Sequence, residues 1–322
     1  MPATPYNGLL LLNKKSGITS FEALNEVKKI FATKKVGHTG TLDKFASGLL
    51  LALIGRGVKL ACLFENCVKE YTGTIAFGEE TDTLDPYGIV SARGEVPSRE
   101  AVEAVLDGFR GEILQAPPAY SAVHVNGRRA YELALEGKEP EMKKRPVTVY
   151  ELSIISWTPP EAEIRAIVSA GTYIRSLARD IALAVGSRAH LSSLTRTKVG
   201  PFSLANAANK KTKDNENGNN IEKIREALLP LDVNLFKNLS IPFFLIDKIA
   251  EEKFIHGRPL ETLLPAESVL PGNKTSVFPE GVYAGVFRKS DPGVLLGAVK
   301  RKNSGWTYVS VFPGNDHGIK DN

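Results

Sequence analysis

The chain has 322 residues, of which 43% are hydrophobic and 24% are charged, and its formal net charge is +5. This composition is typical of a folded protein of one or two domains and excludes wholesale disorder. No run of about 18 apolar residues predicts a membrane span, and the first residues lack a secretory-signal pattern. Two cysteines, Cys62 and Cys67, cannot form a disulfide framework, so we expect a cytoplasmic protein.

Charge is unevenly distributed along the chain. Residues 1–60 carry a net charge of +6, residues 171–200 carry +4, and residues 69–110 carry −5. Two basic segments flanking an acidic one could fold into the basic groove that is typical of nucleic-acid binders. Scattered solvated lysines produce the same counts, and charge alone favours that plainer interpretation.

The first third of the chain mixes strand and helix patterns. The apolar run Gly8–Asn13 predicts a buried strand, and Thr19, with Glu22 three residues later, has the capping-box spacing that begins a helix. The expected apolar face of this helix comprises Phe21, Leu24, Val27 and Phe31. Residues 37–48 form a glycine-punctuated loop, and the apolar run Leu49–Ile54 is interpreted as a helix.

The middle of the chain predicts hairpins separated by helices. Strands are expected over Tyr71–Phe77 and His190–Val199, and a hairpin over Val147–Trp157 and Glu161–Ser169. Helices are expected after Ser98 and from Thr172 to the stop at Gly186. Because strict βαβ alternation is missing, residues 1–238 are predicted to form an α+β domain.

The last part of the chain changes character. Residues 209–220 are polar and low in complexity, which predicts a flexible loop. Four short β runs set between turn residues follow: Leu260–Leu263, Gly281–Phe287, Val294–Val299 and Trp306–Phe312. They predict a small β-barrel within residues 239–322.

Metal and nucleotide motifs are missing from the sequence. The two cysteines and five scattered histidines lack zinc-ligand spacing, so no metal site is predicted. Residues 37–41 are glycine-rich but lack the Gly-Lys-Ser/Thr end of a P-loop, and no G-x-S-x-G elbow occurs.

The most unusual segment is GHTGTLDKFASGLL, residues 37–50. Its glycines allow tight turns and the close approach of a large ligand. Asp43 lies in a basic neighbourhood, where a carboxylate would stay ionised and could act as nucleophile or base. An Asp side chain that bonds to its own loop backbone is the alternative.

This segment closely resembles the G-H-T-G-x-L-D-P-x-A-x-G-x-L signature of the TruB-type tRNA pseudouridine synthases. Five further blocks resemble the family in the same order: LLLLNKKSGITS at 9–20, KEYTGTIAFGEETDTLDPYG at 69–88, PPAYSAVHVNGRRAYELALEG at 117–137, GTYIRSLARD at 171–180 and AHLSSLTRTKVGPF at 189–202. The resemblance covers about residues 8–204, and the β-rich tail resembles the PUA-type RNA-binding barrel of many members.

The resemblance implies isomerisation of the T-loop uridine of tRNA, position 55 in standard tRNA numbering, to pseudouridine. It implies a pseudouridine synthase fold, α+β with a mixed, largely antiparallel central sheet flanked by helices. It also implies a catalytic group and a substrate-binding group. The catalytic residues are Asp43, the aspartate, Tyr71, which stacks on the target base, and Arg175, which pairs with the aspartate. The substrate-binding residues are His38, which holds the flipped-out loop, Leu194, which closes the pocket, and Lys14, placed near the RNA.

The implied reaction breaks the N1–C1′ bond, turns the uracil and joins C5 to C1′. The Asp43 carboxylate could attack C1′ or C6, or take a proton from C2′ to pass through a glycal, and the sequence does not choose between these routes. The Tyr71 phenol is a candidate base for the C5 proton. No redox step, phosphate donor or metal is needed, so no cofactor is expected.

Four residues depart from the family pattern. Lys15 and Lys44 stand where the family has proline, Asn13 replaces an aspartate and His124 a lysine. The expected partner is the T-arm of tRNA, the chain is expected to act as a monomer without a guide RNA, and no membrane association is expected. An RNA chaperone that opens the tRNA elbow without chemistry is the rival function, and a guide-dependent synthase in a ribonucleoprotein is a third.

Overall fold

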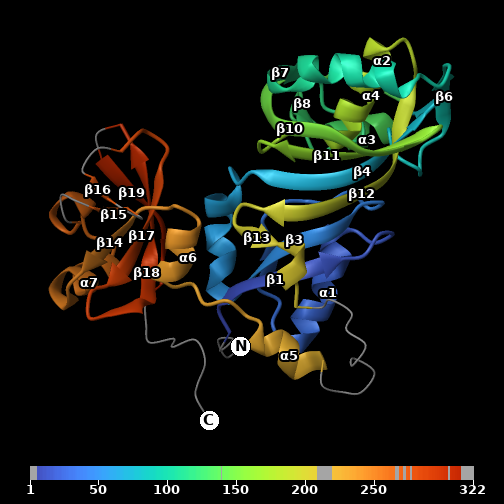
Figure 1. Ribbon diagram of the computed structural model, residues 1–322. Coiled ribbons are helices and arrows are strands. Elements are labelled where there is room, and N and C mark those ends of the chain that lie inside the picture. Colours follow the sequence, from blue (N-terminus) through green and yellow to red (C-terminus); the bar gives the residue numbers. More distant parts are fainter. Residues whose placement is uncertain are drawn as a thin grey trace.

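The computed structural model describes residues 6–138, 140–208, 220–264, 268–270, 273–275, 278–303 and 305–312. Figure 1 shows two sheets joined through the α5–α6 region, a large one built from the first two thirds of the chain and a smaller one from the last third. Among the described residues, no helix is long and apolar enough to cross a membrane.

The large sheet has nine strands in the order β1-β3-β12-β4-β11-β10-β7, with β2 on β3 and β13 on β12. Every pairing is antiparallel except that of β3 with β12. The strands are β1 (Gly8–Lys14), β2 (Val36–His38), β3 (Ser47–Ile54), β4 (Lys69–Phe77), β7 (Gly111–Gln115), β10 (Arg145–Thr158), β11 (Glu161–Val168), β12 (Ala189–Val199) and β13 (Phe202–Ser203). This arrangement confirms the expected α+β class with a mixed, largely antiparallel central sheet.

Helices and two small hairpins surround this sheet. The α-helices are α1 (Ser20–Ile30), α2 (Arg99–Val105), α3 (Ala130–Leu135), α4 (Ile174–Ala184), α5 (Asn220–Glu226) and α6 (Val233–Asn238), with 3₁₀ turns η1 (Gly55–Phe64), η2 (Leu106–Phe109) and η3 (Leu204–Asn206). The hairpins pair β5 (Glu79–Thr81) with β6 (Val90–Arg93) and β8 (His124–Val125) with β9 (Arg128–Arg129). The expected hairpin around Pro159 is the β10–β11 pair.

The interpretation of Leu49–Ile54 as a helix is wrong, because these residues belong to strand β3. Alternate β3 residues pack into two different apolar clusters, Leu50 and Ala52 on one face and Leu49 and Leu51 on the other. A strand buried on both faces is apolar throughout and lacks the two-residue alternation that distinguishes it from a short buried helix. β3 pairs with β1 on one side and with β12 on the other, which leaves it central in the sheet.

Helix α1 begins as expected and buries a narrower face than expected. The Thr19 side chain accepts from the Glu22 N–H, and the Glu22 carboxylate accepts from the Thr19 N–H, which confirms the capping box. Leu24, Val27 and Phe31 are buried. Phe21 was placed on this face wrongly: it is 66% exposed, because it lies at the margin of the stripe in the first turn.

The smaller sheet has the order β16-β15-β14-β17-β18-β19, with β14 and β17 parallel. Its elements are β14 (Phe243–Ile246), α7 (Lys248–Ile255), η4 (Leu260–Thr262), β15 (Ser268–Leu270), β16 (Asn273–Thr275), β17 (Tyr283–Arg288), β18 (Asp291–Lys302) and β19 (Gly305–Val311). The expected strand at Leu260–Leu263 is wrong, since this segment forms the 3₁₀ turn η4, which buries Leu260. The predicted 209–220 loop lies outside the described residues up to Asn219.

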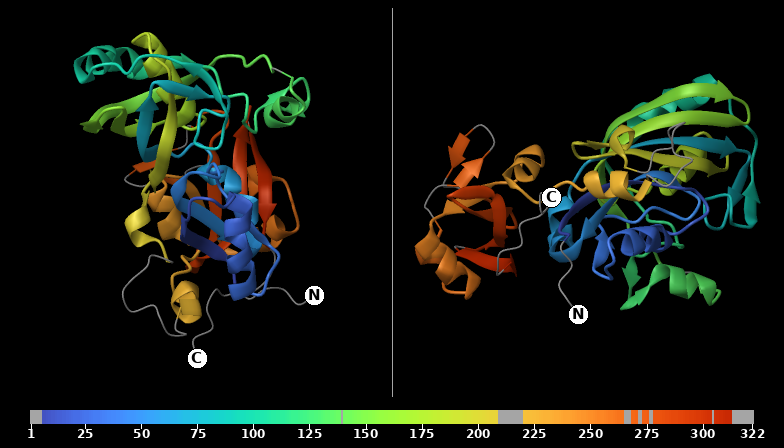
Figure 2. Two further views of the ribbon diagram at one scale, coloured as in Figure 1. Left: turned by 90° about the vertical axis from the view of Figure 1, so that its right-hand side faces the viewer. Right: turned by 90° about the horizontal axis from the view of Figure 1, so that it is seen from below.

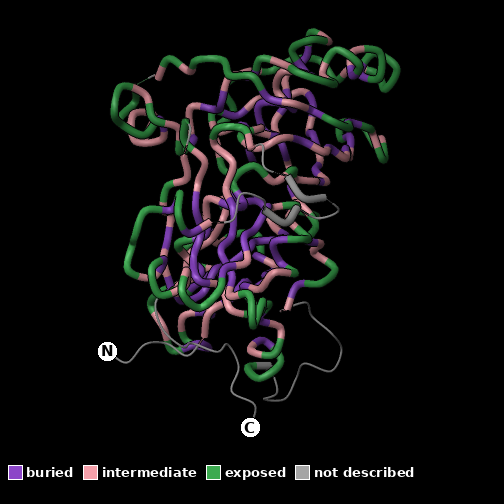
Figure 3. Tube along the Cα trace, turned by 90° about the vertical axis from the view of Figure 1, so that its left-hand side faces the viewer, coloured by how far each residue is buried: buried purple, intermediate pink, exposed green. Residues whose placement is uncertain are grey.

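A shared apolar cluster connects the two sheets. It includes Leu51 of β3 and Phe64 of η1 together with Phe236 of α6 and Phe287 of β17. The Phe236 and Phe287 rings meet edge to face at 5.0 Å between centroids. The right-hand view of Figure 2 shows the two sheets as separate bodies side by side, and Figure 3 shows the buried segments concentrated in the interior of the trace. The division at residue 238 stays a prediction.

Gly48, at the start of β3, provides a test of this packing. Its φ is +104°, and a Cβ there would lie 2.4 Å from the Arg196 carbonyl oxygen of β12. The new Cβ is attached to the β3 backbone, and the atom that it would meet belongs to the β12 backbone, so neither strand can relieve the clash by moving a side chain. We therefore expect Gly48→Ala to lower the free energy of unfolding by about 2 kcal/mol or more. Urea unfolding measures the effect.

Gly108→Ala is the matched control. A Cβ at Gly108 would meet no heavy atom within 4 Å, and its φ is not in the left-handed region. We expect its free energy of unfolding to stay within about 1 kcal/mol of wild type. Equal losses in the two variants would show that the β3–β12 contact is not close-packed.

Candidate active site

The glycine-punctuated loop at residues 39–46 connects β2 to β3 and is fixed by hydrogen bonds. Thr39 N–H donates to the Leu51 carbonyl at 3.1 Å, and Ala46 N–H donates to the Asp43 carbonyl at 3.1 Å. The Ser20 hydroxyl, at the start of α1, accepts from Leu42 N–H at 2.8 Å and donates to Leu42 O at 3.1 Å. The residue before Asp43 is therefore held in place by the neighbouring helix.

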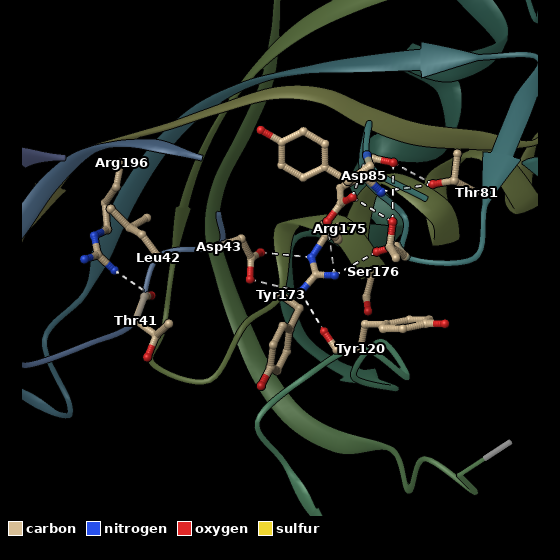
Figure 4. Close-up of polar contacts among 12 residues, drawn as sticks. Thr41, Leu42, Asp43, Thr81, Asp85, Tyr120, Tyr173, Arg175, Ser176 and Arg196 are labelled. Carbon is tan, nitrogen blue, oxygen red and sulfur yellow. Dashed lines mark hydrogen bonds and ion pairs between the residues drawn. The ribbon is translucent and has the colours of Figure 1, made fainter. Parts of the chain in front are cut away.

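The Asp43 carboxylate lies against the Arg175 guanidinium (Figure 4). Arg175 Nη2 donates to Oδ1 at 3.0 Å. Its Nε lies 2.9 Å from Oδ2 as an ion pair, without the alignment of a second hydrogen bond. The Arg175 side chain is 4% exposed and that of Asp43 is 33% exposed. The contact with Arg175 therefore orients the Asp43 carboxylate, which remains partly open to solvent.

Two backbone carbonyls hold the other edges of the Arg175 guanidinium. Nη1 donates to the Thr83 carbonyl at 2.7 Å, and Nη2 donates to the Tyr120 carbonyl at 3.0 Å. Arg175 lies in the first turn of α4, where the helix dipole disfavours a cation. The carboxylate and the carbonyls offset that cost, and they fix the guanidinium against segments from three distant parts of the chain.

A second carboxylate, Asp85, also faces Arg175. Its Oδ2 lies 3.7 Å from Arg175 Nη1. Its Oδ1 accepts from the Thr83 hydroxyl at 2.7 Å and from the Tyr87 N–H at 3.0 Å. The buried arginine therefore lies between two carboxylates, and Asp85 is fixed in turn by its own loop.

Tyr71 and Leu194 lie on the same face of adjacent strands. Arg196 of β12 pairs with Tyr71 of β4, so these two side chains point to the same face of the sheet. Leu194 lies two residues before Arg196 in β12 and therefore points to that face as well. Both are buried, Tyr71 at 9% and Leu194 at 6% exposure. Their apolar cluster also contains Leu42, which precedes Asp43 directly.

Arg196 supports the same loop from the sheet. Its buried guanidinium donates from Nε to the Leu49 carbonyl at 2.8 Å and from Nη2 to the Gly40 carbonyl at 3.1 Å, with a longer bond to Thr41 O. Within the described chain, no carboxylate lies within 4.0 Å of it. Carbonyl oxygens alone therefore accept its hydrogen bonds.

Lys14 and His38 lie at the ends of β1 and β2. Lys14 Nζ donates to the Ile18 carbonyl at 2.7 Å, and burial lowers the pKa of Lys14 to about 8, against an opposing effect of the Asp43 charge. Burial, and secondly the charge of Arg196, lowers the pKa of His38. The buried His38 Nδ1 has no hydrogen-bond partner among the described residues.

The structure brings only some of the six expected residues into direct contact. Asp43 and Arg175 touch, and Tyr71 and Leu194 share one sheet face. Lys14 and His38 form no hydrogen bond or ion pair with Asp43 in the part of the chain that is described. These placements do not test the roles that the resemblance implies.

Sequence reasoning missed three residues of this site: Asp85, Tyr173 and Arg196. Asp85 and Tyr173 lie inside blocks that were recognised, and Tyr173 precedes Arg175 by two residues. Burial, with the Asp43 charge as a smaller cause, raises the pKa of Tyr173. Arg196 also lies inside a recognised block, in strand β12, whose sequence AHLSSLTRTKV mixes polar and apolar residues and offers no separate signal for it.

Cys62 and Cys67 are free thiols, and burial raises the pKa of each. In the described ranges, no three His, Cys, Asp or Glu side chains gather as metal ligands.

Comparison with known families matches two adjacent segments. The sequence model described as TruB family pseudouridylate synthase (N terminal domain) matches residues 28–174. The one described as tRNA pseudouridylate synthase B C-terminal domain matches residues 175–235. The first contains Asp43, and the second begins at Arg175.

Several relatives share this similarity. The tRNA pseudouridine synthase B of Borreliella burgdorferi is 51% identical over 201 residues, which cover 62% of this chain and 71% of the relative. That of Chromohalobacter salexigens is 40% identical over 259 residues, 79% of this chain and 82% of the relative.

Solved structures match the fold across nearly the whole chain. A Cbf5-Nop10-Gar1 complex contains a chain with a TM-score of 0.67 and 24% identity, covering 98% of this chain and 88% of the other. An H/ACA RNP bound to a substrate RNA contains one with a TM-score of 0.64 and 22% identity, covering 97% and 86%. On the family matches and these relatives, the chain belongs to the TruB family and is a pseudouridine synthase, an isomerase.

Proposed function

We propose that this protein isomerises the T-loop uridine of tRNA, position 55, to pseudouridine. The relatives' shared name, tRNA pseudouridine synthase B, supports tRNA as the substrate. The observation that carries the proposal is the Asp43–Arg175 contact, because it presents one oriented carboxylate that is 33% exposed on a loop fixed from three sides.

The reaction needs a carboxylate in a defined position at the sugar or the base. Asp43 either attacks C1′ or C6, or removes the C2′ proton to form a glycal. In each route the N1–C1′ bond breaks, the uracil turns and C5 joins C1′. C5 then loses its proton, and either the bond to Asp43 breaks or the proton returns to C2′. Each of these routes begins at the Asp43 carboxylate, which lies against the buried Arg175 guanidinium. With one Asp43 oxygen hydrogen-bonded by Nη2, the carboxylate is oriented before the substrate arrives.

The target uridine must leave its stacked position to reach Asp43, at a cost of a few kcal/mol. We assign Tyr71 to stack on the flipped base and serve as candidate base for the C5 proton, and Leu194 to close the site around it. Their shared sheet face beneath Leu42 supports this assignment. His38 is assigned to hold the flipped loop.

Lys14 is assigned to a position near the RNA, although its ammonium group already donates to two carbonyls. The smaller sheet is proposed to be a PUA-like RNA-binding barrel, with residues 1–238 as the catalytic domain and 239–322 as the barrel. Monomeric state, a cytoplasmic location, independence from a guide RNA and from a cofactor stay predictions.

The direct test measures tritium release from a tRNA transcript that carries 5-tritiated uridine, with the purified protein alone. Wild type should release about one equivalent per tRNA, since only one uridine is flipped and exchanged at C5. Asp43→Asn should lower turnover by about 10³-fold or more while leaving tRNA affinity within about twofold.

A transcript with cytidine at position 55 is the matched substrate control and should release no tritium. Release from that transcript would assign the activity to another uridine. Tight tRNA binding by wild type and by Asp43→Asn, with no release from either, would favour the RNA chaperone.

Asp85 is expected to act through Arg175. Asp85→Asn keeps the shape but removes the charge 3.7 Å from Nη1, so the guanidinium loses part of its orientation. We expect kcat to fall by about 10- to 100-fold while KM changes little, because Asp85 is buried and its altered atom faces Arg175. Single-turnover kinetics on tRNA separate these parameters.

Asp82→Asn is the matched control, a carboxylate in the same loop whose oxygens bond Ile89 N–H and the Tyr120 hydroxyl. It should keep kcat within about threefold of wild type. If both variants lost activity equally, the loop as a whole would be responsible, and the contact of Asp85 with Arg175 would not.

A further inference from the structure

Two exposed lysines and an exposed tyrosine lie on the loops that build the Asp43 site, and their side chains have no part in the contacts described above. Lys15 follows β1, Lys44 follows Asp43 directly, and Tyr87 follows Asp85 by two residues. All three are exposed, and the Tyr87 side chain is 58% exposed. Residues of these types on one surface are suited to phosphate contact and base stacking.

The two lysines are on loops that are hydrogen-bonded to each other. Gly17 N–H donates to the Lys44 carbonyl at 2.8 Å, and the Ser16 hydroxyl donates to the Phe45 carbonyl at 2.6 Å. The Lys15 carbonyl accepts from Lys14 Nζ at 3.0 Å, which anchors that loop to the end of β1. Their backbones are therefore fixed relative to Asp43, while their ammonium groups extend into solvent.

Neither ammonium group is neutralised within the protein. In the described structure, no carboxylate lies within 4.0 Å of Lys15 or Lys44. Glu22 is close enough for the Lys44 charge to act on it, but its carboxylate accepts from Thr19 N–H and the Thr19 hydroxyl in the capping box. Two positive charges next to the reaction centre thus remain available to an anionic ligand.

Tyr87 is tied to the same centre through its backbone. Its N–H donates to Asp85 Oδ1 at 3.0 Å, and Asp85 faces Arg175, which contacts Asp43. Lys44 Nζ lies 5.9 Å from the centroid of the Tyr87 ring. Contacts therefore lead from Asp43 through Arg175 and Asp85 to Tyr87. The Tyr87 ring in turn lies near Lys44, the residue that follows Asp43.

We propose that Lys15, Lys44 and Tyr87 form an accessory RNA-binding surface, in which the two ammonium groups contact phosphates of the substrate and the Tyr87 ring stacks on an unpaired base beside the target uridine. The proposal rests on the proposed function, because it takes the RNA as substrate. Neither lysine belongs to the signature residues, so this surface adds contacts of the chain's own.

The first experiment measures tRNA binding by fluorescence anisotropy between 50 and 200 mM KCl for wild type, Lys15→Gln, Lys44→Gln and the double variant. Removing one lysine–phosphate contact should lower the slope of log affinity against log salt by about 0.7 to 0.9. Lys223→Gln, at an exposed position of α5, is the matched control and should leave the slope unchanged.

The second experiment tests the tyrosine by tritium release and binding. Tyr87→Ala keeps the N–H that bonds Asp85 but removes the ring, so KM should rise by about 5- to 100-fold while kcat changes little. Tyr87→Phe keeps the stacking surface and should restore most of the affinity. A fall in kcat in Tyr87→Ala without a change in KM would overturn the stacking role.

The outcomes separate this surface from the proposed function. If wild type converts tRNA but the lysine variants keep the wild-type salt slope and KM, the surface proposal is wrong and the function stands. If wild type binds tRNA with a slope that the double variant lowers, yet releases no tritium, the function is wrong and the surface stands.

Discussion

The buried positive charge of Arg175 is the constraint on which the site depends. A guanidinium that is 4% exposed requires anionic or carbonyl partners on every edge, because an unpaired buried charge costs several kcal/mol. Asp43, Asp85 and the carbonyls of Thr83 and Tyr120 meet that requirement, and they come from three loops far apart in the sequence. Satisfying one side chain therefore assembles the loops around the Asp43 carboxylate, and the geometry exists only in the folded chain.

The sheet gives this assembly its rigidity. β3 follows the Asp43 loop and is buried on both faces between β1 and β12. The close approach of Gly48 to the backbone of Arg196 leaves no space for a side chain, so the loop enters the sheet at a fixed point. Arg196 then binds the carbonyls of Gly40 in the loop and of Leu49 in β3. This support acts on the backbone and adds to the burial of the loop's own side chains Leu42 and Phe45.

The sequence could predict the members of the site better than their contacts. Ordered motif blocks identified Asp43 and Arg175, and the capping box located the start of α1, because both depend on short-range patterns. Leu49–Ile54 was misassigned because burial on both faces removes the periodicity that separates strand from helix. Asp85 escaped notice because its part in the site depends on the 3.7 Å approach to a residue 90 positions away, which no local pattern encodes.

The acidic and basic segments of the sequence contribute charged residues with different roles in the folded structure. The acidic segment 69–110 contributes Asp85, and there negative charge neutralises Arg175 instead of repelling an RNA. The basic segment 1–60 contributes Lys15 and Lys44, which are exposed and have no carboxylate within 4.0 Å among the described residues. The buried charges of Asp85 and Arg175 fix the positions of the side chains around Asp43. The exposed charges of the two lysines are the ones that we propose bind the RNA. On the proposed function, an anionic substrate that binds the exposed charges is brought to Asp43, whose position is already set by Arg175, so binding and orientation are contributed by different residues.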